Sequence, residues 1–238
     1  MTEQEFTSIA HQKLTWNSPL SPSHADELIV RLPVAAGDII VDLGCGWGEF
    51  LLRTLRQHPD TTGIGLDISA DNVRRAMARA NELGMQSRVH FKVQDASNWA
   101  GHGDVFLCIG SAYIWKGPVP LLRALSHRAK HVLLGEGYWA QSPTPEVVTM
   151  IGAGLSTLAE LSDLCASSGF RPLHVTIADQ YEWDTFESDW RAGLEIWASR
   201  QNDSCDARRA RELSDVRRNE YLRGYRGILG FAYLMLSK

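Results

Sequence analysis

Three glycines alternate with other residues in the stretch Asp42-Leu43-Gly44-Cys45-Gly46-Trp47-Gly48-Glu49. Glycine adopts backbone conformations that other residues avoid, and it lets a ligand approach the main chain closely. An apolar run over 39–41 precedes the stretch and an apolar-periodic segment over 50–55 follows it, which predicts a buried strand, a tight turn and a helix. The free N–H groups at the start of that helix would point into the same crevice. The stretch therefore predicts a site for a nucleotide or a nucleotide-like cofactor.

Two phosphate-binding motifs fit the stretch poorly. A mononucleotide loop needs a Gly-Lys-Ser/Thr element for phosphate and magnesium, and the stretch has none. A dinucleotide fold needs G-x-G-x-x-G/A. Gly44 and Gly46 match it, but position 49 is glutamate and the third glycine comes one residue early, at Gly48. A carboxylate at Glu49 would face a pyrophosphate unfavourably, so a nicotinamide-dependent oxidoreductase is kept only as an alternative.

The surrounding elements alternate between strand and helix patterns. An α/β fold with a doubly wound, mostly parallel sheet and helices on both faces follows from this order. After 135 the alternation gives way to a long connection and then to two long helical patterns before an apolar last strand. Strands are expected at 38–42, 62–67, 89–93, 104–109, 131–135, 173–177 and 228–236, and helices at about 3–14, 22–31, 47–57, 70–83, 118–128, 157–167, 180–200 and 205–223.

The pattern Asp-Leu-Gly-Cys-Gly-x-Gly over 42–48 resembles the first motif of class I (Rossmann-like) S-adenosylmethionine-dependent methyltransferases. The resemblance extends over roughly 25–178 and onto the final strand, and segments at 182–187 and 221–227 resemble uncharacterised bacterial members. It implies a seven-stranded sheet whose last strand is antiparallel and lies between the fifth and sixth. We expect a single methyltransferase domain over 1–238, with an N-terminal lid at 1–24 and insertions at 136–157 and 180–224 over the active site.

The resemblance also implies the residues that bind S-adenosylmethionine and its product S-adenosylhomocysteine. Asp67, at the end of the second strand, would accept both ribose hydroxyls, although it could instead cap the next helix, a role for which Ser69 is better placed. Asp95 would contact the adenine amino group, with an ordinary turn residue as the alternative. The cofactor-binding residues expected are Asp42, Gly44, Cys45, Gly46, Asp67, Ile68, Asp95, Ala96, Ile109, Gly110 and Ser111.

Methyl transfer is an in-line displacement at carbon, so much of the acceleration comes from holding the acceptor in line with the methyl group. A general base is needed only if the acceptor must lose a proton. The catalytic candidates are Glu136, which stands between two glycines after the fifth strand, Tyr113, which follows the fourth, and His11 in the N-terminal helix. A helix-cap or salt-bridge role is the alternative for Glu136.

Aromatic residues are expected near the mouth of the site, because ligands bind at the carboxyl ends of strands in such sheets. They favour a flat aromatic or cationic small molecule as the acceptor. The alternative for Trp183 is the buried face of its own helix. The substrate-binding residues expected are Trp16, Trp115, Tyr138, Trp139 and Trp183.

Known motifs for other acceptors are missing. The run Ile109-Gly110-Ser111-Ala112-Tyr113 after the fourth strand lacks the Asn/Asp-Pro-Pro-aromatic motif of base-directed enzymes and the acids that hold magnesium in catechol methyltransferases. We therefore expect a metal-independent methyltransferase acting on a small molecule. A protein- or RNA-directed methyltransferase and a non-catalytic S-adenosylmethionine-binding protein remain alternatives, and the acceptor atom is left open.

Composition and charge limit which classes of partner, metal site and location we expect. The 238 residues are 44% hydrophobic and carry a formal net charge of −4, which argues against a nucleic-acid partner. The arginines over 208–218 are interleaved with acids at helical spacing and predict a solvated helix face. Four widely spaced cysteines, no signal peptide and no long apolar run are typical of a cytoplasmic protein without a zinc site or a membrane span. The oligomeric state is left open.

Overall fold

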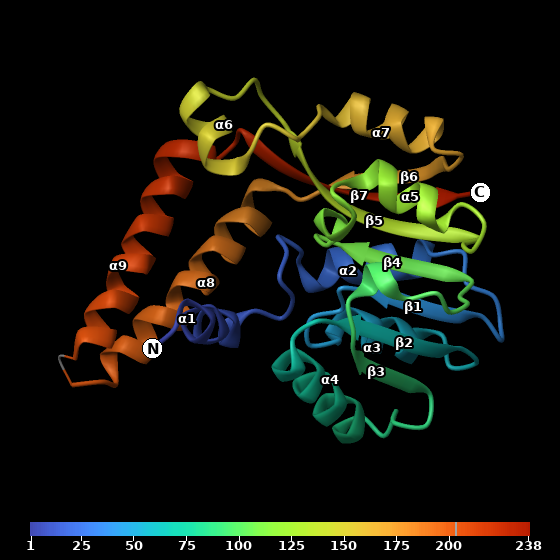
Figure 1. Cartoon of the computed structure of the whole chain (residues 1–238), viewed down its shortest axis with the longest axis horizontal. Coiled ribbons are helices and arrows are strands. Elements are labelled where there is room, and N and C mark those ends of the chain that lie inside the picture. Colours follow the sequence, from blue (N-terminus) through green and yellow to red (C-terminus); the bar gives the residue numbers. More distant parts are fainter. Residues whose placement is uncertain (203) are drawn as a thin grey trace. The chain divides into compact units, whose positions relative to one another are not determined.

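The computed structural model of the chain describes residues 1–202 and 204–238 and divides into two compact units (Figure 1). The larger unit is formed by residues 21–138, 156–177 and 231–238. The smaller unit is formed by residues 1–20, 139–155 and 178–230. The expected single domain with a lid and insertions over an active site stays a prediction.

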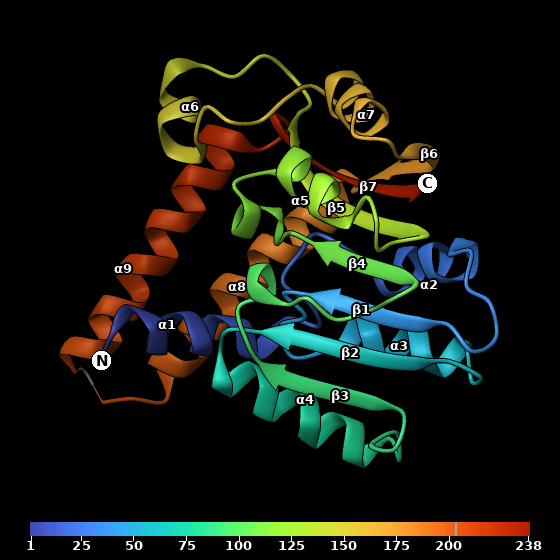
Figure 2. The ribbon, with the colours of Figure 1, turned by 45° about the vertical axis from the view of Figure 1, so that its right-hand side comes forward.

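A seven-stranded sheet with the order β3-β2-β1-β4-β5-β7-β6 is the framework of the larger unit. Neighbouring strands from β3 to β5 are parallel, and β7 pairs antiparallel with β6. Figure 2 shows the arrowheads of β1 to β4 at the same edge. The sheet order and the antiparallel last strand confirm the fold expected from the sequence. The strands are β1 (Ile39–Leu43), β2 (Thr62–Asp67), β3 (Val89–Val93), β4 (Val105–Ile109), β5 (His131–Trp139), β6 (Arg171–Ile177) and β7 (Leu229–Ser237).

Helices cover the sheet, and their starts follow from the local sequence. Ser21 accepts a hydrogen bond from the His24 N–H and Pro22 occupies the first turn of α2, as N-cap rules predict. Ser69 caps α4 in the same way. The helices of this unit are α2 (Pro22–Arg31), α3 (Glu49–Gln57), α4 (Ala70–Glu82), α5 (Pro118–Leu125) and α7 (Leu158–Ser167), with short 3₁₀ turns at Ala96–Asn98 and Ala112–Trp115.

One apolar cluster joins the strands to α5 and α7. Phe106 and Val132 from the central strands are fully buried, and they belong to the same cluster as Leu122 from α5 and Leu161 from α7. Burial of such side chains is the main stabilising contribution to a fold of this kind. The cluster fixes the positions at which β1, β4 and β5 end.

The smaller unit is helical. Its helices α8 (Gln180–Ser199) and α9 (Cys205–Glu220) pack against each other, and a π-helical turn, Tyr221–Tyr225, follows α9. Helix α1 (Glu3–Ala10), followed by a 3₁₀ turn at His11–Lys13, packs on α8. The apolar cluster that joins these helices contains Phe6, Ile9, Ala10, Leu194, Ala198, Ala207 and Ala210.

Strand β5 is longer than the sequence indicates. The expected strand stops at 135, whereas β5 runs to Trp139, so residues 136–139 are strand rather than the start of a connection. The two glycines around Glu136 hid the strand signal. Pairing with a neighbouring strand supplies the order that this local sequence lacks, as β5 lies beside β7.

The connection after β5 contains a helix that the sequence pattern did not predict. Helix α6 (Pro145–Ile151) begins at the Thr144 cap, with a proline in its first turn. At seven residues it is too short to show a clear apolar period. In the described residues 1–202 and 204–238, no helix is long and apolar enough to cross a membrane.

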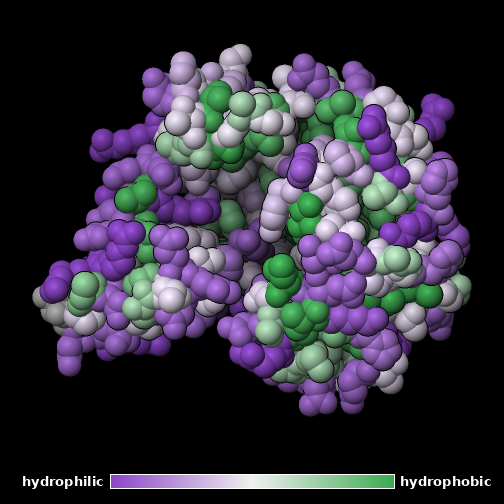
Figure 3. Space-filling view, in the orientation of Figure 1, coloured by the Kyte–Doolittle hydropathy of each residue, from purple (hydrophilic) through white to green (hydrophobic). Residues whose placement is uncertain are grey.

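The arginines of α9 form a solvated face only in part. Figure 3 shows a mostly hydrophilic surface over α9. Arg209 with Glu212 and Arg218 with Asp215 form ion pairs one turn apart, as expected for such a face. Arg217 departs from the prediction, because it is half-buried and binds the buried Glu187 on α8.

Replacing Gly193 by alanine is expected to destabilise the smaller unit. A Cβ there would lie 2.7 Å from the backbone oxygens of Ile9 and Ala10, so α1 would have to move away from α8. Overpacking of this kind costs about 1–3 kcal/mol, against the gain of about 1 kcal/mol that alanine brings to a helix. Gly154→Ala is the matched control, since a Cβ at Gly154 meets nothing within 4 Å. Thermal denaturation should show a lower melting temperature for Gly193→Ala alone, and equal melting temperatures would contradict this packing.

Candidate active site at the carboxyl ends of β1, β2, β4 and β5

The glycine turn after β1 is held between the ends of β2 and β4. The N–H groups of Gly44 and Cys45 both donate to the Leu66 carbonyl at 2.9 Å. On the other side, the Ser111 hydroxyl donates to the Leu43 carbonyl. Gly44 has a φ of +82°, and a Cβ on it would lie 2.6 Å from the Ser111 Cβ. Glycine is therefore required at Gly44 by both its conformation and the close approach of β4.

At Gly46 only the backbone conformation favours glycine. Its φ is +54°, but a Cβ built on it would meet no atom within 4 Å. Its N–H donates to the Asp67 Oδ2 at 2.9 Å. The turn thus presents bare backbone to open space beside a carboxylate, which leaves room for a ligand at this position.

Asp67 organises the end of β2 as well as facing the turn. Its Oδ1 accepts hydrogen bonds from the Ser69 N–H at 2.8 Å and from the Asn72 side chain at 3.3 Å. Ser69 itself caps α4, so Asp67 does not have to. Sequence reasoning missed Asn72, although a residue in the first turn of the following helix is placed to reach back to the strand end. The ribose role of Asp67 stays a prediction that this geometry permits.

The glycine turn contains the buried carboxyl of Asp42 and the half-buried thiol of Cys45. Asp42 is 5% exposed, and burial, together with the charge of Asp67, raises the pKa of its carboxyl to about 8. Burial also raises the pKa of the Cys45 thiol well above its usual value. Cys45 therefore stays a thiol at neutral pH, which disfavours a role as a nucleophile, and its expected contact with the cofactor stays a prediction.

Asp95, after the end of β3, has the turn role that the sequence analysis gave as its alternative. Its Oδ1 accepts hydrogen bonds from the Ser97 N–H at 2.8 Å and the Ser97 hydroxyl at 2.7 Å, and these bonds lower the pKa of the carboxyl. Ala96, the next residue, is buried. Asp95 is therefore a turn residue in this structure, and an additional contact to adenine stays a prediction.

Large apolar side chains are exposed where β2 and β4 end. Ile68, directly after Asp67, is 77% exposed, and Tyr113, in the turn after β4, is 76% exposed. Gly110 at the end of β4 has a φ of +69°, and its N–H donates to the Gly135 carbonyl at 2.9 Å. Exposed apolar side chains gathered at one edge are typical of a binding surface.

Glu136 lies within β5, immediately after Gly135, which pairs with Ile109. Its carboxylate accepts a hydrogen bond from the Gly137 N–H at 3.1 Å. Burial raises the pKa of this carboxyl to about 7. In the part of the chain that the structure describes, it forms no ion pair and caps no helix, which are the two alternatives considered from the sequence.

The other residues expected in the larger unit differ in exposure. Trp115 is half-buried against the main apolar cluster. Tyr138 is 5% exposed, and burial raises the pKa of its phenol. Tyr138 thus has a packing role in this structure, whereas Tyr113 is open to a ligand.

Four expected site residues belong to the smaller unit. His11 begins the 3₁₀ turn after α1, and Trp139 is half-buried at the end of β5. Trp16 is buried, and its indole N–H donates to the Leu20 carbonyl. Trp183 is buried edge-on against Phe186 and Tyr225, which fits its alternative as the inner face of a helix. The catalytic and substrate roles of these residues stay predictions.

Another contact covers the start of α3. Trp47 is 7% exposed, and the Arg75 guanidinium of α4 lies 4.5 Å from the centre of its ring. Sequence reasoning missed Arg75, because the contact joins two helices whose packing is not local. Among residues 1–202 and 204–238 there is no group of three or more His, Cys, Asp or Glu side chains placed to hold a metal ion.

Comparisons with known proteins agree with this geometry. A family model described as a methyltransferase domain matches residues 40–137. The uncharacterised protein YjhP of Escherichia coli K12 is 30% identical over 215 residues, which cover 86% of each chain. The X-ray structure of YjhP has a TM-score of 0.88 at 28% identity, covering 98% of this chain and 100% of that chain. A Geobacter sulfurreducens S-adenosylmethionine-dependent methyltransferase, solved with S-adenosylhomocysteine, has a TM-score of 0.90 at 27% identity, covering 98% and 97% of the two chains.

Gly46→Ala is expected to weaken S-adenosylhomocysteine binding at least roughly tenfold, because its Cβ would project into the open space beside Asp67. The positive φ alone costs about 1–2 kcal/mol of stability for a residue with a Cβ. Gly84→Ala is the matched control, since Gly84 has a φ of +67° with nothing within 4 Å and ends α4. Calorimetric titration should show weaker binding only for Gly46→Ala, and equal affinities in the two variants would contradict the assignment.

Glu136→Gln is expected to change how stability depends on pH. The pKa of Glu136 is raised from 4.5 to about 7 in the folded chain, so between these values the folded state holds a proton that the unfolded state has lost. Stability must therefore fall as pH rises through this window, by roughly 1–3 kcal/mol for this one group. Urea denaturation should show the variant gaining stability relative to the parent from pH 4.5 to pH 7.

Glu27→Gln is the control for this comparison, because Glu27 is exposed on α2 of the same unit. Its stability difference from the parent, measured over the same pH range, is the baseline against which the change for Glu136→Gln is read. A change for Glu136→Gln no larger than this baseline would mean that the Glu136 carboxyl titrates normally.

Proposed function

We propose that this chain, which belongs to the S-adenosylmethionine-dependent methyltransferases, transfers the methyl group of S-adenosylmethionine to a small-molecule acceptor by metal-independent in-line displacement. Family membership, the cofactor and methyltransferase activity follow from the comparisons and the fold. The acceptor class and the mechanism are our inference. The mechanism rests on the carboxylates of Asp42 and Glu136, and the acceptor class rests on the exposed ring of Tyr113 and the net charge of the chain.

The residues at this edge fit the cofactor. The open backbone at Gly46 leaves room for a ligand, and Asp67 holds a carboxylate beside it. S-adenosylmethionine supplies an activated methyl group on a positively charged sulfur. We infer that Ile68 and Ala96 cover the base, and that Ile109, Gly110 and Ser111 line the opposite side of the cofactor.

Asp42 suits a cationic ligand. Its carboxyl is buried at 5% exposure, and its pKa is raised by burial and by the negative charge of Asp67. A positive charge bound nearby would stabilise the ionised form of Asp42 and lower its pKa. We infer that Asp42 favours a positively charged cofactor over an anionic dinucleotide, in agreement with Glu49 in the first turn of α3.

Glu136 is the observation that carries the proposed mechanism. A pKa near 7 lets its carboxylate take a proton from an acceptor at neutral pH and still hold it. Its side chain is half-buried and forms no ion pair among the described residues, so no cation competes for its carboxylate. We infer that Glu136 is the general base for an acceptor that loses a proton on methylation. We keep Tyr113 and His11 as further catalytic candidates.

The acceptor is inferred to be an aromatic or cationic small molecule. Tyr113 presents an exposed ring at the end of β4. Trp16, Trp115, Tyr138, Trp139 and Trp183 are kept as candidate contacts to it. The acidic balance of the chain, with a net charge of −4, disfavours an RNA acceptor, and the run after β4 holds no acid for magnesium.

A methyl-transfer assay with labelled S-adenosylmethionine tests this function. Incubation with a panel of small phenols, amines and carbon acids, in the presence of a chelator, should label at least one compound. Glu136→Gln should lower kcat by about 10²–10⁴-fold, the usual contribution of a general base, and should remove the pH dependence near 7. Glu27→Gln should leave kcat unchanged.

Other outcomes separate the alternatives. Label found only in protein or RNA substrates would favour a macromolecular acceptor. Binding of S-adenosylhomocysteine without any transfer would favour a non-catalytic binding protein. Full activity of Glu136→Gln would overturn the assignment of Glu136 while leaving methyl transfer itself intact.

A further inference from the structure

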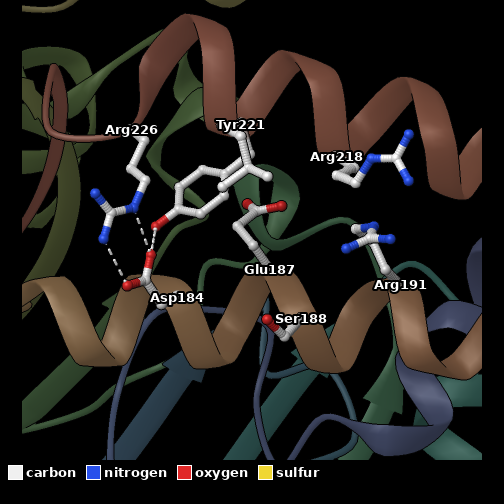
Figure 4. A pocket seen from close by; sticks show the side chains of 8 residues that line it. Asp184, Glu187, Ser188, Arg191, Arg218, Tyr221 and Arg226 are labelled. Carbon is white, nitrogen blue, oxygen red and sulfur yellow. Dashed lines mark hydrogen bonds and ion pairs between the residues drawn. The ribbon is translucent and has the colours of Figure 1, made fainter.

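A cavity of about 420 Å³ opens between α8 and the end of α9 in the smaller unit (Figure 4). Its size is within the range of small-molecule sites. Five of its eight lining residues are charged, and a tyrosine and a leucine supply the apolar part of its wall. The lining residues are Asp184, Glu187, Ser188, Arg191, Arg218, Tyr221, Leu222 and Arg226.

Asp184, the first of the two acidic residues in the cavity, is neutralised by Arg226. Arg226 donates two hydrogen bonds to Asp184, at 2.8 Å to each carboxylate oxygen, and the Tyr221 hydroxyl donates a third at 2.6 Å (Figure 4). These bonds, with that from Arg226 the strongest, lower the pKa of Asp184 to about 2. Asp184 therefore has little remaining capacity to bind an external cation.

The second acid, Glu187, is neutralised by Arg217, which does not line the cavity. Glu187 is 2% exposed and accepts two hydrogen bonds from Arg217, at 2.7 and 2.9 Å. The Arg217 guanidinium also lies 4.4 Å from the centre of the Trp190 ring. Bidentate pairing of this kind satisfies both charges, so Glu187 does not balance the remaining arginines.

Two guanidinium groups are left without a carboxylate from the facing helix. Arg191 on α8 donates its Nε–H to the Ser214 carbonyl at 3.0 Å, and no described carboxylate forms an ion pair with it. Arg218 on α9 pairs only with Asp215 of its own helix, among residues 1–202 and 204–238. Figure 4 shows Arg191 and Arg218 extending from the two helices at the same end of the cavity. Asp215 offsets the charge of Arg218, whereas no described carboxylate offsets that of Arg191, so this end of the cavity keeps an excess of positive charge that an anion would stabilise.

We propose that this cavity binds a small organic anion whose carboxylate or phosphate group is held between Arg191 and Arg218. The planar guanidinium is the side chain best suited to both groups, because its N–H donors match their oxygens. Ser188 offers a hydroxyl at the same site, and the Tyr221 ring and Leu222 contact the apolar part of the ligand. The argument for this site does not rest on the proposed methyl-transfer mechanism.

Calorimetric titration of the full chain with inorganic phosphate and, separately, with succinate tests the proposal at low ionic strength, where such contacts are least screened. Saturable binding is expected for at least one probe, and the stronger of the two identifies the group that the site prefers. Arg191→Gln and Arg218→Gln should each weaken that binding about tenfold or more. Arg209→Gln is the matched control, because Arg209 makes the same type of ion pair on α9 but lies outside the cavity.

The absence of saturable binding up to about 10 mM of either probe would overturn the proposal. Retained binding in Arg191→Gln or in Arg218→Gln would do the same, and so would an equal loss in Arg209→Gln. Titration of the same samples with S-adenosylhomocysteine shows whether the variants are folded. It also keeps failure of this site distinct from failure of the methyl-transfer site.

Discussion

The candidate site of the larger unit depends on hydrogen bonds that hold the glycine turn after β1 between the ends of β2 and β4. The Leu66 carbonyl of β2 accepts the N–H groups of Gly44 and Cys45, and Ser111 after β4 bonds the Leu43 carbonyl on the opposite side. This close approach leaves no room for a Cβ at Gly44. Because both sides of the turn are held by the sheet, the backbone at Gly46 is fixed before any ligand arrives. Preorganisation of this kind lowers the entropic cost of binding.

Carboxylates in the two units are used in opposite ways. In the larger unit, Asp42 is buried and Glu136 is half-buried, neither forms an ion pair among the described residues, and burial raises the pKa of both. In the smaller unit, Asp184 and Glu187 are each paired bidentately with an arginine. A buried carboxylate without a partner favours a cationic ligand or a proton. Among the described residues, Arg191 and Arg218 of the same cavity have no carboxylate partner on the facing helix, so the sites proposed in the two units would take ligands of opposite charge.

Local sequence signals predicted most of the elements. Ser21 with Pro22, and Ser69, start helices where capping chemistry requires them, and the apolar runs of the central strands lie in the buried sheet. These local signals did not predict segments whose secondary structure depends on a neighbouring element or that are very short. Residues 136–139 are strand because they lie beside β7, and α6 is too short to show a period. Arg217 is not part of the solvated face that the sequence predicts, because it forms an ion pair with Glu187 on the neighbouring helix α8.

The sequence by itself determined the sheet, the glycine turn and the residue types at the strand ends, because periodicity, capping and glycine conformation are local properties. It also limited the cofactor, since Gly48 and Glu49 disfavour a pyrophosphate. Only the tertiary structure decided which carboxylates stay unpaired. Glu136 carries a raised pKa, whereas one carboxylate oxygen of Asp95 accepts two hydrogen bonds from Ser97. Burial and pairing depend on contacts between residues far apart in the chain, and no local pattern records them.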